Sequence, residues 1–303
     1  MGLLFEGRIN MSKIIRAIDS EGLVRVSFIN SRDMVEEARR IHKTSPVATA
    51  ALGRTLTMTA LIGSGMKSKD DTVSVFIKGD GPLGQIVCTA NGNGAVKGYL
   101  ANPFVDIPLK PNGKLDVGGA VGKGSLSITM DLGLKEPYCG QVPLVTGEIA
   151  EDFTYYYAKS QQIPTAISLG VLVDKDYTVK QAGGLFIQLM PGCDDETAAL
   201  IEKNVTELKP VTTMLEEGMS EDLIITSVFA GLFFKYLDED EYNYKCDCSR
   251  EKIEKALISL GEKELVDMIN EDHKAEVTCR FCPEVYKFTE FELIDLLNRA
   301  KIK

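Results

Sequence analysis

Cys246-Asp247-Cys248 and Cys279-Arg280-Phe281-Cys282 are two tight cysteine pairs, and thirty residues separate them. Thiolates are soft, strongly donating ligands that suit tetrahedral zinc, and two short-spaced pairs supply four of them. The stretch therefore predicts a four-cysteine zinc site that binds one Zn²⁺ per chain. The one-residue spacer of the first pair departs from the usual two-residue spacing and gives a tighter bite on the metal.

The residues around the two pairs predict a small C-terminal zinc domain, residues 242–303. Ser249 and Gly261 have the types that begin and end a helix, and they bound a segment with apolar residues at helical spacing. A strand is expected after the second pair, where Thr289 and Glu292 then form a capping box for a last helix. A domain this small rarely buries enough apolar surface to be stable alone, and structural zinc contributes about 10 to 16 kcal/mol in finger-like modules. We therefore expect loss of the metal to unfold it.

Residues 1–192 predict an α+β domain with a mainly antiparallel sheet and packed helices. A hairpin is expected over residues 13–29, and two helices follow it. Short β-rich runs separated by glycine-rich turns then indicate antiparallel strands. The expected strands after the helices are residues 73–77, 85–90, 95–100, 126–130, 165–173 and 178–189.

Residues 193–241 predict an acidic and apolar helical linker. Ser220 is expected to cap a helix whose apolar side chains run over residues 223–237. In the resting state we expect this linker to pack on the sheet domain. Because like charges oppose compaction, the linker is expected to be marginally stable and to expose an apolar surface when its neighbour unfolds.

The formal net charge of −10 lies entirely in the middle of the chain. Residues 1–193 carry 20 basic and 18 acidic side chains, residues 194–241 carry 3 and 13, and residues 242–303 carry 11 and 13. This distribution is a poor match for phosphate backbones, so nucleic acid is not an expected partner. A zinc-ribbon module that binds nucleic acid or transcription components is the alternative interpretation, and a plain structural zinc protein is the third.

The compartment expected from the sequence is the cytoplasm. The longest nearly apolar run, residues 223–234, is too short to cross a membrane, and residues 1–5 do not resemble a secretory signal; Met11 is an alternative start. Cysteines in metal-like pairs without a signal peptide are typical of a reducing cytosol. The three remaining cysteines are expected to be small buried or half-buried residues: Cys88, Cys139 and Cys193.

Motifs for catalysis are not indicated, and we do not expect an enzyme. The two histidines, His42 and His273, lie far apart in the sequence. Gly79-Asp80-Gly81-Pro82-Leu83-Gly84 matches the dinucleotide fingerprint, but a strand rather than a helix is expected after it, so we interpret it as a hairpin turn. The second cysteine pair lacks the strand-to-helix setting of a thioredoxin-like dithiol.

Several further motifs accompany the cysteine pattern from about Lys13 onward. They are Thr44-Ser45-Pro46 with residues 48–54, the 79–84 turn, Gly98-Tyr99, Gly147-Glu148-Ile149-Ala150-Glu151-Asp152, Ser160-Gln161-Gln162, Gly183-Gly184 and Cys248-Ser249-Arg250-Glu251. Together they resemble a family of bacterial redox-regulated heat-shock chaperones, zinc-binding holdases of about this chain's mass of 33.2 kDa. The first ten residues and the extra cysteines depart from the family pattern without touching the zinc motif.

The resemblance implies an ATP-independent chaperone that is inactive while reduced and zinc-bound. Oxidation together with unfolding stress would release zinc, form disulfides and allow the protein, often as a homodimer, to bind unfolding client proteins and prevent their aggregation. The client surface would come from the linker and the adjoining part of the N-terminal domain. The linker residues expected to contribute are Leu223, Ile224, Val228, Phe229, Leu232, Phe233 and Phe234.

Our hypothesis for the disulfides is local pairing, Cys246 with Cys248 and Cys279 with Cys282. Local bonds close tiny loops and leave the two halves of the zinc domain unlinked. A cross-pair bond would close a loop of about thirty residues and stabilise the folded form by roughly 3 kcal/mol or more. Local pairing would therefore allow the zinc domain to unfold, and cross pairing would keep it folded. The one-residue spacer should also give a strained, readily reduced disulfide.

Overall fold

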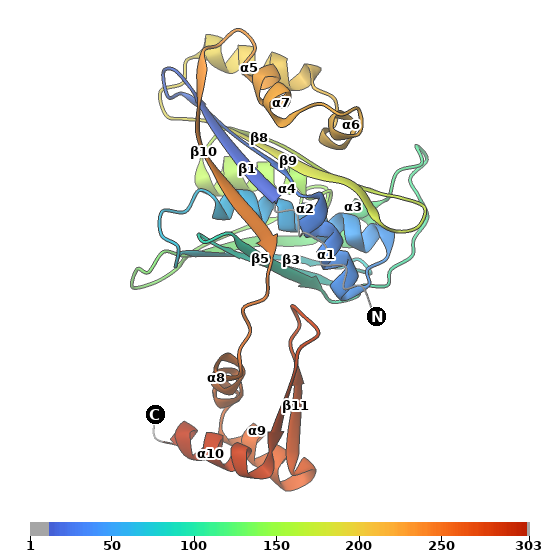
Figure 1. The fold of residues 1–303 in the computed structure, drawn as a ribbon, viewed down its shortest axis with the longest axis vertical. Helices are drawn as coiled ribbons and strands as arrows, with labels where there is room; N and C mark the ends of the chain where they lie inside the picture. The colour runs from blue at the N-terminus through green and yellow to red at the C-terminus, as the bar shows by residue number, and fades with distance from the viewer. Residues whose placement is uncertain (1–11, 302–303) are drawn as a thin grey trace, which may run out of the picture. The chain divides into compact units, whose positions relative to one another are not determined.

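The computed structural model describes residues 12–301, so the two candidate starts, Met1 and Met11, lie outside the described residues, as do residues 1–5. The chain divides into two compact units, Met1–Lys245 and Cys246–Lys303. In the described residues, the larger unit contains a ten-stranded sheet, and the smaller contains a two-stranded sheet with helices (Figure 1). The predicted α+β class, with a mainly antiparallel sheet and a C-terminal four-cysteine module, is confirmed.

The strands of the large sheet are β1 (Ser12–Asp19), β2 (Val24–Asn30), β3 (Thr72–Gly79), β4 (Gln85–Asn91), β5 (Ala95–Leu100), β6 (Gly124–Asp131), β7 (Tyr138–Pro143), β8 (Thr165–Val173), β9 (Val179–Leu189) and β10 (Phe234–Tyr244). The helices of this unit are α1 (Arg32–His42), α2 (Pro46–Gly63), α3 (Val117–Val121), α4 (Ala150–Tyr156) with the π-helical turn η1 (Tyr157–Gln161), α5 (Asp195–Glu207), α6 (Val211–Glu216) and α7 (Glu221–Val228). The smaller unit contains α8 (Arg250–Leu260), α9 (Glu262–Asp267) with the π-helical turn η2 (Met268–Asp272), β11 (Lys274–Thr278), β12 (Val285–Thr289) and α10 (Glu290–Lys301).

The large sheet has the order β7-β6-β3-β4-β5-β10-β1-β2-β9-β8. We call β7-β6-β3-β4-β5 the first half-sheet and β10-β1-β2-β9-β8 the second half-sheet. Neighbours within each half-sheet are antiparallel, whereas β5 and β10, which join the halves, are parallel. This junction has two residue pairs, Asn243 with Ala95 and Tyr244 with Val96. The two halves are therefore held in one sheet by a short contact between segments far apart in the sequence.

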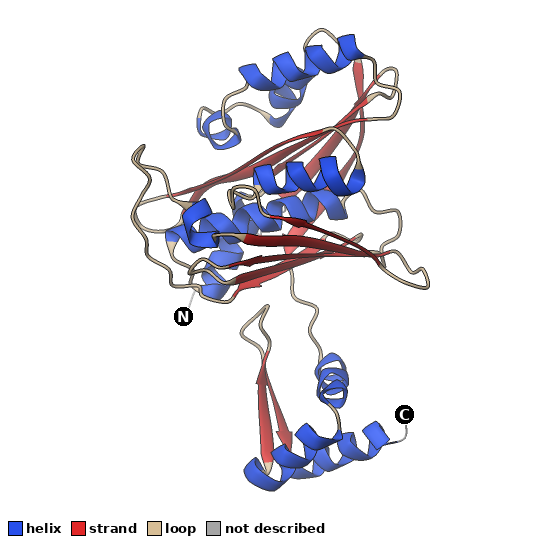
Figure 2. Cartoon of the chain, turned by 180° about the vertical axis from the view of Figure 1, so that it is seen from behind, coloured by secondary structure: helices blue, strands red, loops and turns tan. Residues whose placement is uncertain are grey.

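Helix α2 lies between the two half-sheets and forms the centre of the core (Figure 1, Figure 2). Sixteen of its eighteen residues are buried, because Ala, Gly and Thr side chains allow strands to approach on both sides. Three of its threonines satisfy their hydroxyls inside the helix by donating to backbone carbonyls four residues earlier, at 2.7 to 2.8 Å. At Gly53, a Cβ atom would lie 2.6 Å from a Val35 methyl of α1, so only glycine fits there.

Helices α5, α6 and α7 cover the outer face of the second half-sheet, the face opposite to α2 (Figure 1). Helix α6 packs on β8 and β9, and α7 packs on β2. The buried apolar residues of this layer form a cluster separate from the main core: Ile15, Ala17, Val24, Val26, Phe28, Leu185, Ile187, Ile201, Val211, Met214, Leu215, Ile224, Ile225, Val228 and Phe229. The expected packing of the linker on the sheet domain is thus observed.

The long helix expected over residues 223–237 is wrong in its second half. Helix α7 ends at Val228, Gly231 adopts a left-handed φ of 89°, and the chain then continues as β10. Strand β10 pairs with β1 through seven residue pairs. Helical periodicity in a short apolar run cannot show such a partner, because the partner lies more than two hundred residues earlier in the sequence.

The fingerprint-like segment over residues 79–84 is a hairpin turn between β3 and β4, as expected. A Cβ atom at Gly79 would lie 1.8 Å from the Val121 carbonyl oxygen, so the glycine is required for close contact with the α3 backbone. Within residues 12–301, none of the helices is long and apolar enough to cross a membrane.

Candidate metal centre

The four paired cysteines lie on two loops of the smaller unit. Cys246 and Cys248 follow β10 and precede α8, whose first turn is capped by the Ser249 hydroxyl accepting from the Lys252 amide. Cys279 and Cys282 lie in the turn between β11 and β12. The antiparallel pairing of β11 with β12 and a 2.9 Å hydrogen bond from the Cys279 amide to the Glu284 carbonyl fix this turn.

The structure brings the four sulfur atoms together, all within 4.8 Å of one another. Cys246 Sγ lies 3.7 Å from Cys279 Sγ, and Cys248 Sγ lies 3.4 Å from Cys282 Sγ. In a tetrahedral thiolate site with metal–sulfur bonds of about 2.3 Å, neighbouring sulfurs are about 3.8 Å apart. All four cysteines are half-buried. The cluster can therefore bind one metal ion between the two loops.

Burial and hydrogen bonding distinguish the four thiols. Burial raises the pKa of Cys246 strongly and that of Cys282 to about 11. Burial also opposes ionisation of Cys248, but hydrogen bonds from the Tyr286 hydroxyl and from the other thiols outweigh it and lower the Cys248 pKa. The Tyr286 oxygen lies 3.1 Å from Cys248 Sγ. The contacts of Cys248 thus stabilise negative charge on its sulfur.

Arg250 connects the first cysteine loop to the hairpin that carries the second pair. Its guanidinium lies over the Phe288 ring at 4.4 Å, and it donates to the Lys287 carbonyl at 3.1 Å and to Glu292 Oε1 at 2.6 Å. Glu292 also accepts from the Thr289 amide at 2.7 Å, which completes the predicted capping box of α10. These contacts orient the two loops toward each other.

The apolar core of the smaller unit is small. Five side chains form it: Leu257, Leu265, Phe288, Leu293 and Leu296. Other large apolar side chains of this unit remain on its surface, including Phe291, which is 84% exposed. Because so little apolar area is buried, crosslinking through the four sulfurs is a large part of what can stabilise this unit.

The seven linker residues assigned to client binding occupy different environments. Ile224, Val228 and Phe229 are buried against the second half-sheet, whereas Leu223 and Phe233 are 50% and 87% exposed. Leu232 and Phe234 are half-buried. The Phe229 and Phe234 rings stack at 4.7 Å with an interplanar angle of 9° and so join α7 to β10. The structure therefore presents two of the seven on the surface and covers three.

The other cysteines and the histidines lie outside the cluster. Cys88 is buried and Cys193 is half-buried, as expected, but Cys139 is exposed, so its expected burial is wrong. The reason is that β7 is an edge strand and Cys139 is on its outward-facing side. His42 Nε2 lies 2.8 Å from the Tyr244 hydroxyl, and His273 Nδ1 lies 3.3 Å from Glu290.

Two kinds of residue near the site escaped the sequence reasoning. Tyr286 is expected from its sequence only as a strand residue, and its contact with Cys248 depends on the return of β12 past the first loop. Tyr242 and Tyr244 anchor β10 just before Cys246, but they follow an acidic run that concealed the strand pattern. The spacing of Tyr242 and Tyr244, two residues apart, was the one feature of the sequence that indicated a strand here.

A family model, curated relatives and a solved structure each match almost the whole chain. A family model described as Hsp33 protein matches residues 12–289. The "33 kDa chaperonin" of Clostridioides difficile is 49% identical over 94% of this chain and 98% of its own, and that of Clostridium beijerinckii is 47% identical over 95% and 99%. The crystal structure of the 33 kDa chaperonin (heat shock protein 33 homolog) from Thermotoga maritima superimposes with a TM-score of 0.85 at 41% identity, covering 97% of this chain and 100% of that chain. The chain therefore belongs to the Hsp33 family.

Proposed function

We propose that this protein is a redox-regulated, ATP-independent holdase of the cytoplasm that performs no catalysis. Its family and the names of its relatives support a heat-shock chaperone. In the proposed resting state, the thiols are reduced and hold a metal, and the protein is inactive. Oxidation combined with unfolding stress then exposes a surface that binds unfolding client proteins, and the active form is a homodimer.

The proposed metal is zinc, one ion per chain, held by Cys246, Cys248, Cys279 and Cys282. Four sulfurs within 4.8 Å, with two separations of 3.7 and 3.4 Å, fit the tetrahedral thiolate set that structural zinc prefers. When bound, zinc joins the loop after β10 to the β11–β12 turn. The Tyr286 hydroxyl would donate to one coordinated sulfur, and the Arg250 contacts would keep the loops in place.

The observation that carries the proposal is that four cysteine sulfurs converge in a unit with so few buried apolar side chains. Oxidation of four thiols to two disulfides removes four electrons, which two molecules of hydrogen peroxide accept as they are reduced to water. The sulfurs then cease to be metal ligands. A unit whose crosslink supplied about 10 kcal/mol cannot remain folded without it, since whole domains are stable by only about 5 to 15 kcal/mol.

The proposed disulfides are Cys246 with Cys248 and Cys279 with Cys282. Two short sulfur separations join the loops, Cys246 to Cys279 at 3.7 Å and Cys248 to Cys282 at 3.4 Å, so proximity alone does not favour local pairing. Local pairing is supported by the consequence of each bond: a bond within a loop leaves the unit free to unfold, whereas a bond between loops retains the crosslink. Peptide mapping that recovers mainly bonds between loops would contradict this pairing.

We propose that residues 193–241 act as a functional linker between the N-terminal domain, residues 1–192, and the zinc domain, residues 242–303. In the resting fold, α5 to α7 cover an apolar face of the second half-sheet. This layer carries most of the net negative charge of the chain, which opposes its compaction. Its release would expose both its own apolar side and the sheet face beneath it, which is the client surface we propose.

The test pairs zinc content with suppression of client aggregation before and after treatment with peroxide at elevated temperature. We expect loss of about one zinc per chain together with gained protection of a thermally unfolding client. A variant with all four ligand cysteines changed to Ser tests the switch, and Cys139→Ser is the matched control because Cys139 lies outside the cluster. Zinc loss without gained protection would refute the chaperone assignment and leave the cysteines as structural ligands.

A further inference from the structure

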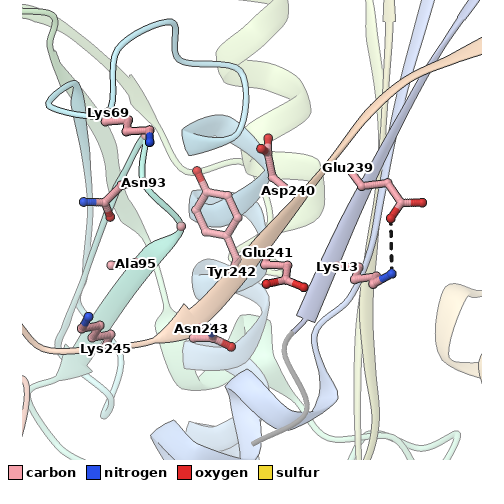
Figure 3. Close-up of a pocket in the computed structure, with 12 residues that line it drawn as sticks. Lys13, Lys69, Asn93, Ala95, Glu239, Asp240, Glu241, Tyr242, Asn243 and Lys245 are labelled. Carbon is pink, nitrogen blue, oxygen red and sulfur yellow. Dashed lines mark hydrogen bonds and ion pairs between the residues drawn. The ribbon is translucent and has the colours of Figure 1, made fainter.

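Strand β10 is a central strand of the large sheet, but only a short junction joins it to the first half-sheet. It pairs with β1 over seven residue pairs and with β5 over two. Beside this short junction, a groove of about 570 Å³ runs along β10 and the β4–β5 turn, with Lys69 and Asn93 on its far wall (Figure 3). Of the eleven residues of β10, Tyr242 alone is buried. Most of the strand is therefore held by its backbone and a few side chains.

Two tyrosines anchor the C-terminal end of β10 to the first half-sheet. Tyr242 is 1% exposed, and its hydroxyl donates to the Asn91 carbonyl at 2.9 Å. Tyr244 donates to the Gly98 carbonyl at 2.8 Å, and His42 Nε2 contacts the same hydroxyl at 2.8 Å. Residues two apart in a strand project to the same side. The first half-sheet thus offers two aromatic sockets at strand spacing, each ending in a backbone acceptor.

Charged residues precede the two tyrosines along β10. Residues 238–241 are Asp-Glu-Asp-Glu, and two cations of β1 meet them. Arg16 pairs with Asp238 at 2.8 Å and Asp240 at 2.6 Å, and Lys13 pairs with Glu239 at 3.3 Å. Figure 3 shows the Lys13–Glu239 pair on the β1 side of the strand, while Tyr242 points away from β1. Four adjacent carboxylates against two cations oppose one another, which weakens the strand.

A single residue, Lys245, separates Tyr244 from Cys246. If the smaller unit unfolds as in the proposed function, the C-terminal end of β10 loses its attachment to a folded neighbour. Its departure would leave unpaired strand edges on both β1 and β5, and unpaired edges template new strands. The two sockets and the two cations would remain beside these edges.

We propose that the slot between β1 and β5, vacated by β10, is a binding site for an extended client segment. This inference rests on the proposed function and specifies the chemistry of its client. The favoured segment has carboxylates that meet Lys13 and Arg16, followed by two aromatic residues two positions apart that enter the tyrosine sockets. Backbone hydrogen bonds to both edges provide affinity, and the sockets provide selectivity. Exchange of β10 between the two copies of the proposed homodimer is a poorer way to fill the slot, because it brings together two linkers that each carry 3 basic and 13 acidic side chains over residues 194–241.

The test uses a fluorescent peptide with the sequence of residues 234–245 and the full chain in two states. Fluorescence anisotropy should show at least tenfold tighter binding to the oxidised, heat-activated chain than to the reduced, zinc-loaded chain. Changing both Tyr242 and Tyr244 of the peptide to Ser should weaken binding at least tenfold. The matched control is a peptide with Tyr236→Ser, which should bind like the original because Tyr236 is 46% exposed in the fold.

Hydrogen exchange shows where on the chain the peptide binds. Fragments covering β1 and β5 should lose amide protection on activation and regain it when the peptide is added. Equal affinity of all three peptides, or unchanged hydrogen exchange in β1 and β5, would contradict the proposed binding site between these strands. Protected β1 and β5 edges in an activated dimer, released on dilution to monomers, would instead assign the slot to exchange between copies. If the activated chain protects a client but does not bind the peptide, the slot is wrong and the proposed function stands; if it protects no client, the proposed function fails.

Discussion

Replacing Phe229 by Ala should weaken the layer formed by α5 to α7 while leaving the metal centre unchanged. The Phe229 side chain is 1% exposed, packs in the cluster over the second half-sheet and stacks on Phe234 at 4.7 Å. Truncating a buried phenylalanine costs about 3 to 5 kcal/mol. Because about 1.4 kcal/mol corresponds to a tenfold change in an equilibrium, local opening should become about a hundredfold more frequent or greater.

Hydrogen exchange of the reduced, zinc-loaded protein measures this opening directly. Fragments that cover α7 should exchange about a hundredfold faster in Phe229→Ala, whereas fragments from β3 and β4 should not change. Client protection should also appear at a lower temperature and peroxide concentration, because less stress is then needed to release the layer. Zinc content before oxidation should remain about one per chain.

Phe233→Ala is the matched control, because Phe233 lies four residues away and is 87% exposed. Surface substitutions usually change stability by less than about 0.5 kcal/mol, so its exchange should match the original protein within about threefold. If Phe233 contributes to the client surface, the activated variant should hold less client without opening earlier. Unchanged exchange in Phe229→Ala, or equal acceleration in both variants, would refute the argument that burial of α7 sets the threshold.

Three further outcomes follow from other contacts. Tyr286→Phe removes the hydroxyl that donates to Cys248 Sγ, so zinc affinity measured by chelator competition should fall about tenfold, while Tyr177→Phe, at an exposed position, should not change it. Burial opposes ionisation of Glu148, but hydrogen bonds from Lys110, Arg54 and the Gly118 amide outweigh it and lower the Glu148 pKa. The ionised carboxylate therefore stabilises the fold above about pH 4.5. This contribution is lost as the pH falls through the pKa of the folded state. Glu148→Gln should thus lower the free energy of unfolding in urea by about 1 to 3 kcal/mol at pH 7, with a smaller difference below pH 4, and an equal difference at both pH values would contradict this origin. Removing zinc with a chelator under reducing conditions should abolish amide protection in α8 and α10 but leave α2 protected; persistent protection in α8 would show that the small apolar core is sufficient by itself.

Local chemistry explains which features could be predicted from the sequence. The hairpin of β1 and β2, the small-residue helix α2 and the capping box at Thr289 depend on residues close to one another in the chain. The pairing of the cysteines into one cluster also follows from local spacing, because each loop carries two ligands by itself. Strand β10 could not be predicted in this way, since helix and strand periods are hard to separate in a short apolar run followed by carboxylates.

By itself, the sequence determined the class of fold, the four thiols able to bind a metal and the acidic character of the linker. Each of these depends on composition or on contacts within a few residues. Only the tertiary structure decided that β10 joins the two half-sheets, that Phe229 is buried while Phe233 stays exposed, and that Tyr286 contacts Cys248. The physical reason is that these contacts join residues distant in the sequence, and their free energy depends on which surfaces the folded chain brings together.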